Sequence, residues 1–403
     1  MGDAGEKRGG FGWLWGATVG AALGDGLSMT VLPLLVADQT RDPMVVSLLH
    51  VATGLPWLLF GLVAGTVVDR WDRRTVMWRT DAARVVVVAL LCALVATDRA
   101  SVPVVLGAAF VLATGSTLIR SAAPAMLPTL VPKERLAAAN GRLQAGATVA
   151  GSFIGPAVGG ALFVLAAVIP LLTQAASVLV SAVCVRRLPR VRPPTAPRSG
   201  RTLGEETLDG VRWILAHPSL RAMASGTILL AAATGILLAV LVIHALEHLG
   251  LPPAGYGLLI SSYAVGSVAG ALSTERLRNR LGVNGCLRSS ALVGGGAIAG
   301  LAVAPGPAPA AVALLLLGVA TMAWNTITVT VRQELTPGHL LGRVTSAFNI
   351  MGVGAAPVAA LVGGAIAAVS STSVAIGVAA ALCVVAFVRL RRLPGPPPQE
   401  CPE

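Results

Sequence analysis

The chain has 403 residues and a formal net charge of +12, yet only 12% of its residues are charged and 55% are hydrophobic. An ordinary soluble domain carries about 25% charged residues, so this composition excludes the usual soluble classes and indicates an integral membrane protein. The positive charges separate long apolar runs instead of clustering on one module, which argues against a nucleic-acid partner and for the lipid bilayer.

Residue types that support a metal site or an ATPase do not form the required patterns. The cysteines include no C-x-x-C pair, which gives neither a disulfide framework nor a thiolate metal site; they are Cys92, Cys184, Cys286, Cys383 and Cys401. Lys7 and Lys133 are the two lysines, and neither follows a glycine, so a Walker A loop is absent. We expect no metal and no cofactor.

Twelve apolar runs are long enough to cross a membrane, which takes roughly 20 residues for about 30 Å of hydrocarbon. They lie near 12–37, 44–68, 77–97, 102–124, 140–164, 166–186, 221–246, 255–275, 286–304, 308–331, 343–367 and 369–389. The predicted fold is therefore all-α, with twelve transmembrane helices in two six-helix bundles, 1–186 and 221–393. Residues 187–220 form a linker, and 394–403 a disordered tail.

The arginines predict the orientation. If both termini are cytoplasmic, nearly all loop arginines fall on the inner side, and the opposite loops hold only Arg41 and Arg99. This asymmetry follows the positive-inside rule and agrees with an even number of spans. We expect a multi-pass protein of a bacterial inner (plasma) membrane with both ends in the cytoplasm.

Asp25 lies near the middle of the first span. A charge there costs roughly 2.5–3.5 kcal/mol on insertion scales, so it seldom persists without a use. We hypothesise that Asp25, together with His50 in the second span, couples protons to substrate. The alternative is that Asp25 pairs with a buried donor, such as His50, and only holds helices together.

The loop after the second span reads GTVVDRWDRR, from Gly65 to Arg74, where apolar chain gives way to charge. It resembles the loop signature of the major facilitator superfamily, G-x-x-x-D-R-x-G-R-R, with Asp72 in place of the last glycine. The resemblance implies that Asp69 meets the positive end of a helix in the other half. The implied conformational latch comprises Gly65, Asp69, Arg70, Arg73 and Arg74; the alternative is a charge cluster that only fixes topology.

The fifth span contains GSFIGPAVGG, residues 151–160, with glycines four apart on one face. Such a face lets a neighbouring helix approach closely, and a proline within the run loosens the backbone. The run resembles the antiporter motif of the same superfamily, G-x-x-x-G-P-x-x-G-G, at every fixed position, which implies export against protons. The matching residues are Gly151, Gly155, Pro156, Gly159 and Gly160; close helix packing alone is the alternative.

Other polar residues within spans have weaker signals. Asp81 and Arg84 are three apart and predict a structural ion pair along one helix face. Gln144, Asn325 and Asn349 could line the pathway or bond neighbouring helices. Arg120 lies in the fourth span, but RSAAPAM does not match the family pattern after the fourth-span arginine, so no role is carried over.

HALEH, at 244–248, has the H-x-x-E-H spacing of a zinc peptidase helix. A hydrolase of that kind would use His244, Glu247 and His248, and would need a further acidic ligand. The next acids, Glu275 and Glu334, are predicted at the opposite side of the membrane. We therefore expect polar groups at the outer end of the seventh span and no enzyme.

The linker and the repeated halves complete the prediction. A short helix is expected from Thr202 to His217, lying on the inner membrane surface with Leu203, Leu208, Val211 and Leu215 on one face. Similar segments recur in both halves. VAG at 63–65 recurs at 268–270, and Pro132 and Pro337 are separated by the same 205 residues. A repeated six-span unit is typical of transporters with a site between the halves.

The function this implies is a secondary active transporter, monomeric, that exports a small hydrophobic or amphiphilic molecule, such as a drug, antibiotic or siderophore, in exchange for protons. The resemblance implies alternating access between the two halves, with a proton gradient as the energy source. An importer of a nutrient and a transport-dead receptor of the same fold are the alternatives. The sequence does not identify the substrate.

Overall fold

The computed structural model describes residues 3–70, 72–189 and 203–391, without the side chains of residues 3–9, 61–70, 133, 137, 203–206, 338 and 339. In this part of the chain every regular element is helical. The bounds are α1 (Asp3–Gln39), α2 (Pro43–Arg70), α3 (Arg73–Ala96), α4 (Val102–Leu130), η1 (Lys133–Arg135), α5 (Leu136–Thr148), η2 (Val149–Ile154), α6 (Gly155–Leu165), α7 (Val168–Arg186), α8 (Leu203–Ala216), α9 (Pro218–Ile243), η3 (His244–His248), α10 (Pro253–Ala302), α11 (Pro307–Leu335), α12 (Gly338–Val369) and α13 (Thr372–Leu390).

Ten of the described helices are long and apolar enough to span a membrane. One of them, α10, has 50 residues and contains a non-helical residue, Gly282, at φ 67°, so it comprises two spans that meet at a break. The helix α3 falls outside the ten because its first half is charged, and it packs between α4 and α7 like a further span. The twelve predicted spans are therefore present. The sequence predicted a loop between 275 and 286. In the structure these residues are helical on both sides of Gly282, and the break is confined to that residue.

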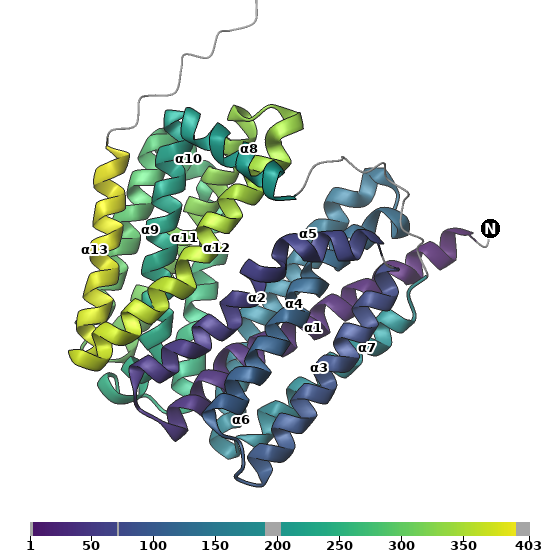
Figure 1. Cartoon of the computed structure of the whole chain (residues 1–403), viewed down its shortest axis with the longest axis horizontal. Helices are drawn as coiled ribbons and strands as arrows, with labels where there is room; N and C mark the ends of the chain where they lie inside the picture. The colour runs from purple at the N-terminus through teal and green to yellow at the C-terminus, as the bar shows by residue number, and fades with distance from the viewer. Residues whose placement is uncertain (1–2, 71, 190–202, 392–403) are drawn as a thin grey trace, which may run out of the picture.

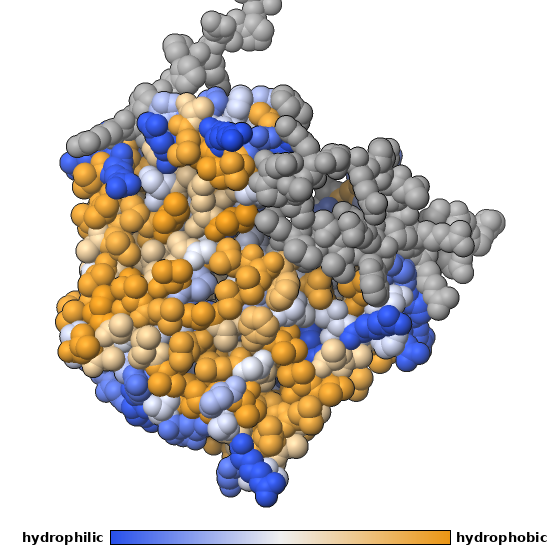
Figure 2. Space-filling model, viewed as in Figure 1, coloured by the Kyte–Doolittle hydropathy of each residue, from blue (hydrophilic) through white to orange (hydrophobic). Residues whose placement is uncertain are grey.

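The surface of the molecule agrees with lipid as its solvent. Figure 2 shows a hydrophobic middle with hydrophilic residues toward both ends of the view. Large apolar side chains are exposed on the helices, including Leu165, Leu272 and Val369. In lipid a backbone can satisfy its own polar groups only within helices or closed barrels, and helices are what this apolar chain forms.

The two halves meet near one end of the molecule and diverge toward the other (Figure 1). Between the halves, α2 packs against α12 and α6 against α10. Close contacts join Gly54 to Pro357 and Gly364 to Ser47. The hydroxyl of Ser261 donates to the Phe153 carbonyl at 3.0 Å. These residues lie toward the ends of their helices that are remote from α8, which we call the closed end.

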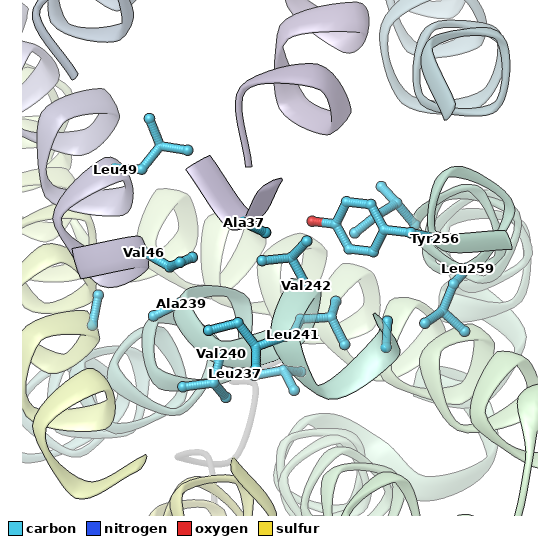
Figure 3. Packing of buried hydrophobic residues seen from close by; sticks show 14 of the residues in the cluster. Ala37, Val46, Leu49, Leu237, Ala239, Val240, Leu241, Val242, Tyr256 and Leu259 are labelled. Atoms are coloured by element: carbon cyan, nitrogen blue, oxygen red, sulfur yellow. The ribbon is translucent and has the colours of Figure 1, made fainter. Parts of the chain in front are cut away.

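The hydrophobic core has the same asymmetry. One buried cluster includes Val46 of α2, Val242 of α9 and Tyr256 of α10, and it therefore spans both halves near the closed end (Figure 3). Two further clusters are confined to single halves, one around Met126 of α4 and the other around Trp324 of α11. The halves thus share apolar packing at one end and have separate cores at the other.

The linker helix α8 packs on the C-terminal half. Ile214 is 1% exposed and joins the core of the C-terminal half, while Leu208 and Leu215 of the predicted apolar face are 54% and 53% exposed. Gly210 lies against the backbone of Arg343 in α12. The helix is therefore docked on the C-terminal half by the face carrying Gly210 and Ile214. The predicted cap at Thr202 and the tail 394–403 lie outside the described residues.

Candidate functional site

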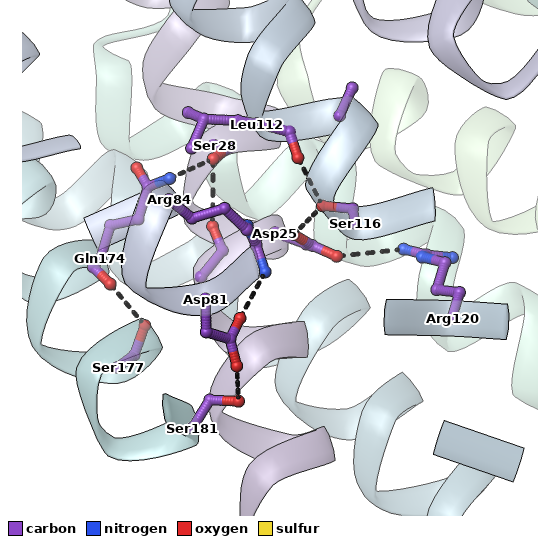
Figure 4. A network of polar contacts seen from close by, with 12 residues as sticks. Asp25, Ser28, Asp81, Arg84, Leu112, Ser116, Arg120, Gln174, Ser177 and Ser181 are labelled. Atoms are coloured by element: carbon purple, nitrogen blue, oxygen red, sulfur yellow. Dashed lines mark hydrogen bonds and ion pairs between the residues drawn. The ribbon is translucent and has the colours of Figure 1, made fainter. Parts of the chain in front are cut away.

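Asp25 of α1 is the centre of a charged network with members on α1, α3, α4 and α7 (Figure 4). Its carboxylate forms an ion pair with Arg84 of α3. The same carboxylate accepts a hydrogen bond from the Ser116 hydroxyl at 2.7 Å and lies 3.5 Å from the guanidinium of Arg120, both on α4. Asp25 therefore has two cationic partners, and its side chain remains 20% exposed.

Arg84 continues the network into the protein. It is 2% exposed and also contacts Asp81, 3.3 Å away and fully buried. Ser181 of α7 donates to the other oxygen of Asp81 at 2.6 Å. Gly115 makes room for the arginine, because a Cβ at that position would lie 2.7 Å from the Arg84 Cδ. A buried cation is thus held between two carboxylates.

Two cavities meet at this network. One, of about 340 Å³, is lined by residues of the N-terminal half that include His50 and Trp57, and by Tyr256 and Ile260 of the other half. The second, of about 420 Å³, lies within the N-terminal half and is lined in part by Gln144. Asp25, Ser116 and Arg120 line both. The carboxylate is therefore accessible from each cavity.

The structure shows which groups pair with Asp25 and with Arg84. The described partners of Asp25 are Arg84, Ser116 and Arg120, and not His50, which lines the same cavity. The predicted pair of Asp81 and Arg84 is present, but it is part of the Asp25 network and not a separate element. Sequence reasoning missed the contacts of Arg120 and Ser116, whose only signal was a lone arginine within an apolar span.

The glycines of residues 151–160 pack against the turn that carries Asp25. A Cβ at Gly155 would lie 2.7 Å from the Gly26 Cα, and one at Gly151 would lie 3.0 Å from the Ala22 carbonyl oxygen. On another side, a Cβ at Gly160 would lie 2.6 Å from the Pro253 carbonyl oxygen in α10. The segment Val149–Ile154 is a π-helix. The glycines thus allow the predicted close packing, against α1 on one side and against α10 of the other half on another.

The residues of the loop signature that are described bind neighbouring helix ends. Asp72 caps α3 by accepting from the Thr75 backbone N–H at 3.1 Å. Arg73 donates to the Ala125 carbonyl at 2.6 Å, and Arg74 donates to the carbonyl of Arg186. Asp72 thus has a capping role that a glycine could not fill with a side chain. The side chains of Gly65, Asp69 and Arg70 lie outside the described residues, and the latch stays a prediction.

A third cavity, of about 380 Å³, lies within the C-terminal half. Its walls come from helices α9 to α13 and include Trp324 and Arg332. The two predicted pathway residues of this half, Asn325 and Asn349, both line it. Their side chains are exposed, so their amides are available to a bound molecule.

The HALEH segment forms a short π-helix at the end of α9. The His244 ring is fully buried, with one nitrogen 3.0 Å from the Thr372 hydroxyl and the other 3.3 Å from the Leu301 carbonyl. Glu247 lies 3.8 Å from Arg41. Both imidazole nitrogens of His244 are therefore occupied by protein groups, and the segment joins helix ends at the closed end.

The helical bundles, the paired halves and the cavities with a charged network define a polytopic membrane transporter. The family model described as "transmembrane secretion effector" matches residues 6–400. The chain belongs to the major facilitator superfamily, and it is a transporter and not an enzyme.

Relatives and solved structures agree with this assignment. The chain is 26% identical to an enterobactin exporter of Escherichia coli, over 93% of this chain and 91% of that protein. It is 32% identical to an uncharacterised MFS-type transporter of Mycobacterium tuberculosis, in a match covering 30% of this chain and only 28% of that protein.

Among solved structures, a bacterial homologue of the iron transporter ferroportin in an inward-facing state superposes with a TM-score of 0.72 at 18% identity, covering 95% of this chain and 98% of that one. The nucleoside transporter NupG superposes with a TM-score of 0.75 at 13% identity, covering 98% of this chain and 100% of that one. At these identities the likeness shows the fold alone.

Proposed function

We propose that this chain exports a small amphiphilic molecule across a bacterial plasma membrane in exchange for protons, and that Asp25 carries the proton. The observation that supports this most directly is the position of its carboxylate. Among the described residues that line the three cavities, Asp25 is the one acidic side chain. It is partly exposed and reachable from two of them.

The charge balance of the network is compatible with a proton carried at Asp25. If Asp25 takes up a proton, Arg84 keeps an ion pair with Asp81, so no buried cation is left without a partner. Arg120 is 72% exposed and can be solvated in the cavity. Removing one member of a buried ion pair is strongly destabilising, and the second carboxylate avoids that cost.

Two further observations support export in particular. The antiporter-like glycines pack directly against the turn of α1 that holds Asp25, so a change at the carboxylate can alter the contact between the two helices. The similarity to an enterobactin exporter extends over nearly the whole of both chains. A single proton is enough for useful work, because 100 mV supplies about 2.3 kcal/mol per charge, roughly a fifty-fold gradient.

We also place both termini and α8 on the cytoplasmic side. The arginine-rich helix ends lie with α8 at the end where the halves diverge, and the positive-inside rule assigns such an end to the cytoplasm. In this orientation the end where the halves diverge faces the cytoplasm, and the closed end faces outward.

Proton release in everted membrane vesicles tests the proposal. Addition of a transported compound, from a panel of antibiotics, dyes and siderophores, should release protons from vesicles that contain the wild-type protein. We expect Asp25→Asn to abolish this release, since an amide cannot carry the proton. The matched control is Asp38→Asn, the same change at an exposed position of the same helix, which should behave as wild type. Wild-type proton release by Asp25→Asn would remove Asp25 from the mechanism.

A further inference from the structure

We infer that the cavity of the C-terminal half binds an anionic group of the transported molecule, and that Arg332 is the residue that holds it. This inference rests on the proposed function, and it adds the chemical class of the substrate: an amphiphile with a negatively charged group. It concerns the cavity of about 380 Å³, which is separate from the Asp25 network.

Arg332 is a buried cation without a described anionic partner. Its side chain lines the cavity and is 7% exposed, and its Nε has no hydrogen-bond partner. The guanidinium carbon lies 5.0 Å from the centre of the Phe348 ring, its one described contact of this kind. A buried charge is costly unless it is paired, so the site favours a ligand that brings a negative charge.

A second polar group that lines this cavity lacks a described partner. The hydroxyl of Ser290, in α10, is buried without a described hydrogen bond and lines the cavity that Arg332 lines. A hydroxyl can donate to an anion, as a guanidinium does. Two unpartnered buried groups from different helices therefore border one space, and a carboxylate or sulfonate could accept from either.

The rest of the wall suits the body of an amphiphile. The indole N–H of Trp324 donates to the Thr227 hydroxyl at 3.2 Å, so the ring offers only its apolar surface. Leu317 and Ile298 extend that surface. The exposed amides of Asn325 and Asn349 supply neutral hydrogen-bonding groups. An apolar skeleton with one anionic group matches these walls.

The contrast with the N-terminal half strengthens the inference. There each described cation in the network, Arg84 and Arg120, lies beside the carboxylate of Asp25. No acidic side chain is found among the residues that line the C-terminal cavity in the described structure. Arg332 thus leaves this cavity with a net positive charge, which attracts an anion.

A pair of dyes that differ in charge tests the inference at equilibrium. Anilinonaphthalenesulfonate and its uncharged parent, phenylnaphthylamine, share an aromatic body, and binding of each is followed by fluorescence in phosphatidylcholine nanodiscs, with empty nanodiscs subtracted. We expect the wild-type protein to bind the sulfonate more tightly than the parent. Arg332→Gln should weaken sulfonate binding about tenfold or more, because a charge-assisted hydrogen bond is lost, and leave the parent unaffected.

Control variants separate this role from a structural one. Arg280→Gln makes the same change at an exposed arginine of the same half and should alter neither affinity. Arg332→Lys keeps the charge and should retain part of the sulfonate preference. Arg332 could instead serve only to stabilise the Phe348 ring and the carbonyl end of α11. In that case Arg332→Gln will lower thermal stability and will weaken the binding of both dyes equally, or of neither. That result, or a wild-type protein with no preference for the sulfonate, would overturn the inference.

The binding measurement needs no proton gradient, so it can fail independently of the proposed exchange. In Asp25→Asn the sulfonate preference should persist although proton release is lost. A preference that persists while wild-type vesicles release no protons would support the anion site and contradict proton coupling.

Discussion

Asp25, Arg84 and Asp81 form a row of alternating charges. Arg84 lies in the middle and forms an ion pair with each carboxylate. Arg84 is 2% exposed and Asp81 is fully buried. Taking such groups out of water is expensive, and their mutual attraction compensates only while all partners are in place. The stability of the N-terminal half therefore depends on all three charged groups being present.

A double-mutant cycle on the buried pair checks this account. Arg84→Gln leaves the buried carboxyl of Asp81 without its cation and with Ser181 as its remaining hydrogen-bond donor, and should lower the free energy of unfolding by about 3–5 kcal/mol. The double variant Asp81→Asn/Arg84→Gln should recover part of that loss, because no charge is then left unpaired. Denaturant unfolding of the purified protein in detergent gives the values.

An exposed ion pair provides the comparison for this cycle. Arg278 and Glu334 lie 3.6 Å apart and are 41% and 57% exposed. Solvent screens such a pair, so Arg278→Gln should cost under about 1 kcal/mol. If Arg84→Gln is no more harmful than Arg278→Gln, the buried row does not stabilise the protein as described.

Helix packing around the fifth span depends on the absence of side chains. Gly155 at the start of α6 and Gly26 in α1 bring two backbones together one residue from Asp25. In lipid, where apolar tails compete with apolar side chains, such close approach is a main source of helix association. The same run contacts α10 through Gly160, so one helix touches both the turn that carries Asp25 and the other half of the molecule.

Gly155→Ala should disturb both stability and transport. The new Cβ would lie 2.7 Å from the Gly26 Cα, which is backbone and cannot rotate away. Overpacking of this kind costs about 1–3 kcal/mol, and the displaced α1 would move Asp25. Thermal unfolding and proton release in everted vesicles measure the two effects. Gly107→Ala, in α4, has nothing within 4 Å of its new Cβ and serves as the control.

At the scale of the whole molecule, the apolar core shared by both halves is confined to the closed end. A rocking motion that opens this end would have to separate contacts such as Ser261 with Phe153 and bring the divergent ends together. The charged network and the C-terminal cavity lie in different halves. Such a motion would therefore change which side of the membrane each one faces and leave the contacts within each half in place. Alternating access of this kind stays a proposal.

Thiol labelling tests the proposed orientation and the open end together. In a background without native cysteines, Gln144→Cys lies in the wall of the cavity of about 420 Å³ in the N-terminal half. It should react with a membrane-impermeant reagent in everted vesicles. Arg99→Cys, on the exposed loop between α3 and α4, should react in intact cells instead. The opposite pattern would place the open end and both termini outside the cytoplasm.

The sequence by itself determined the class of protein, the twelve spans and the glycine face of the fifth span. These depend on local properties: an apolar run of sufficient length must be helical in lipid, and glycines four apart must share a face. Only the tertiary structure decided which polar groups meet. Asp25, Arg84 and Arg120 lie on three different helices. The sequence of an apolar helix does not say which of its faces turns toward the other helices. The tertiary structure also decided which face of α8 packs on the C-terminal half and that Arg332 has no described anionic partner. Contacts between distant segments depend on how whole helices pack, and not on the residues beside them in the chain.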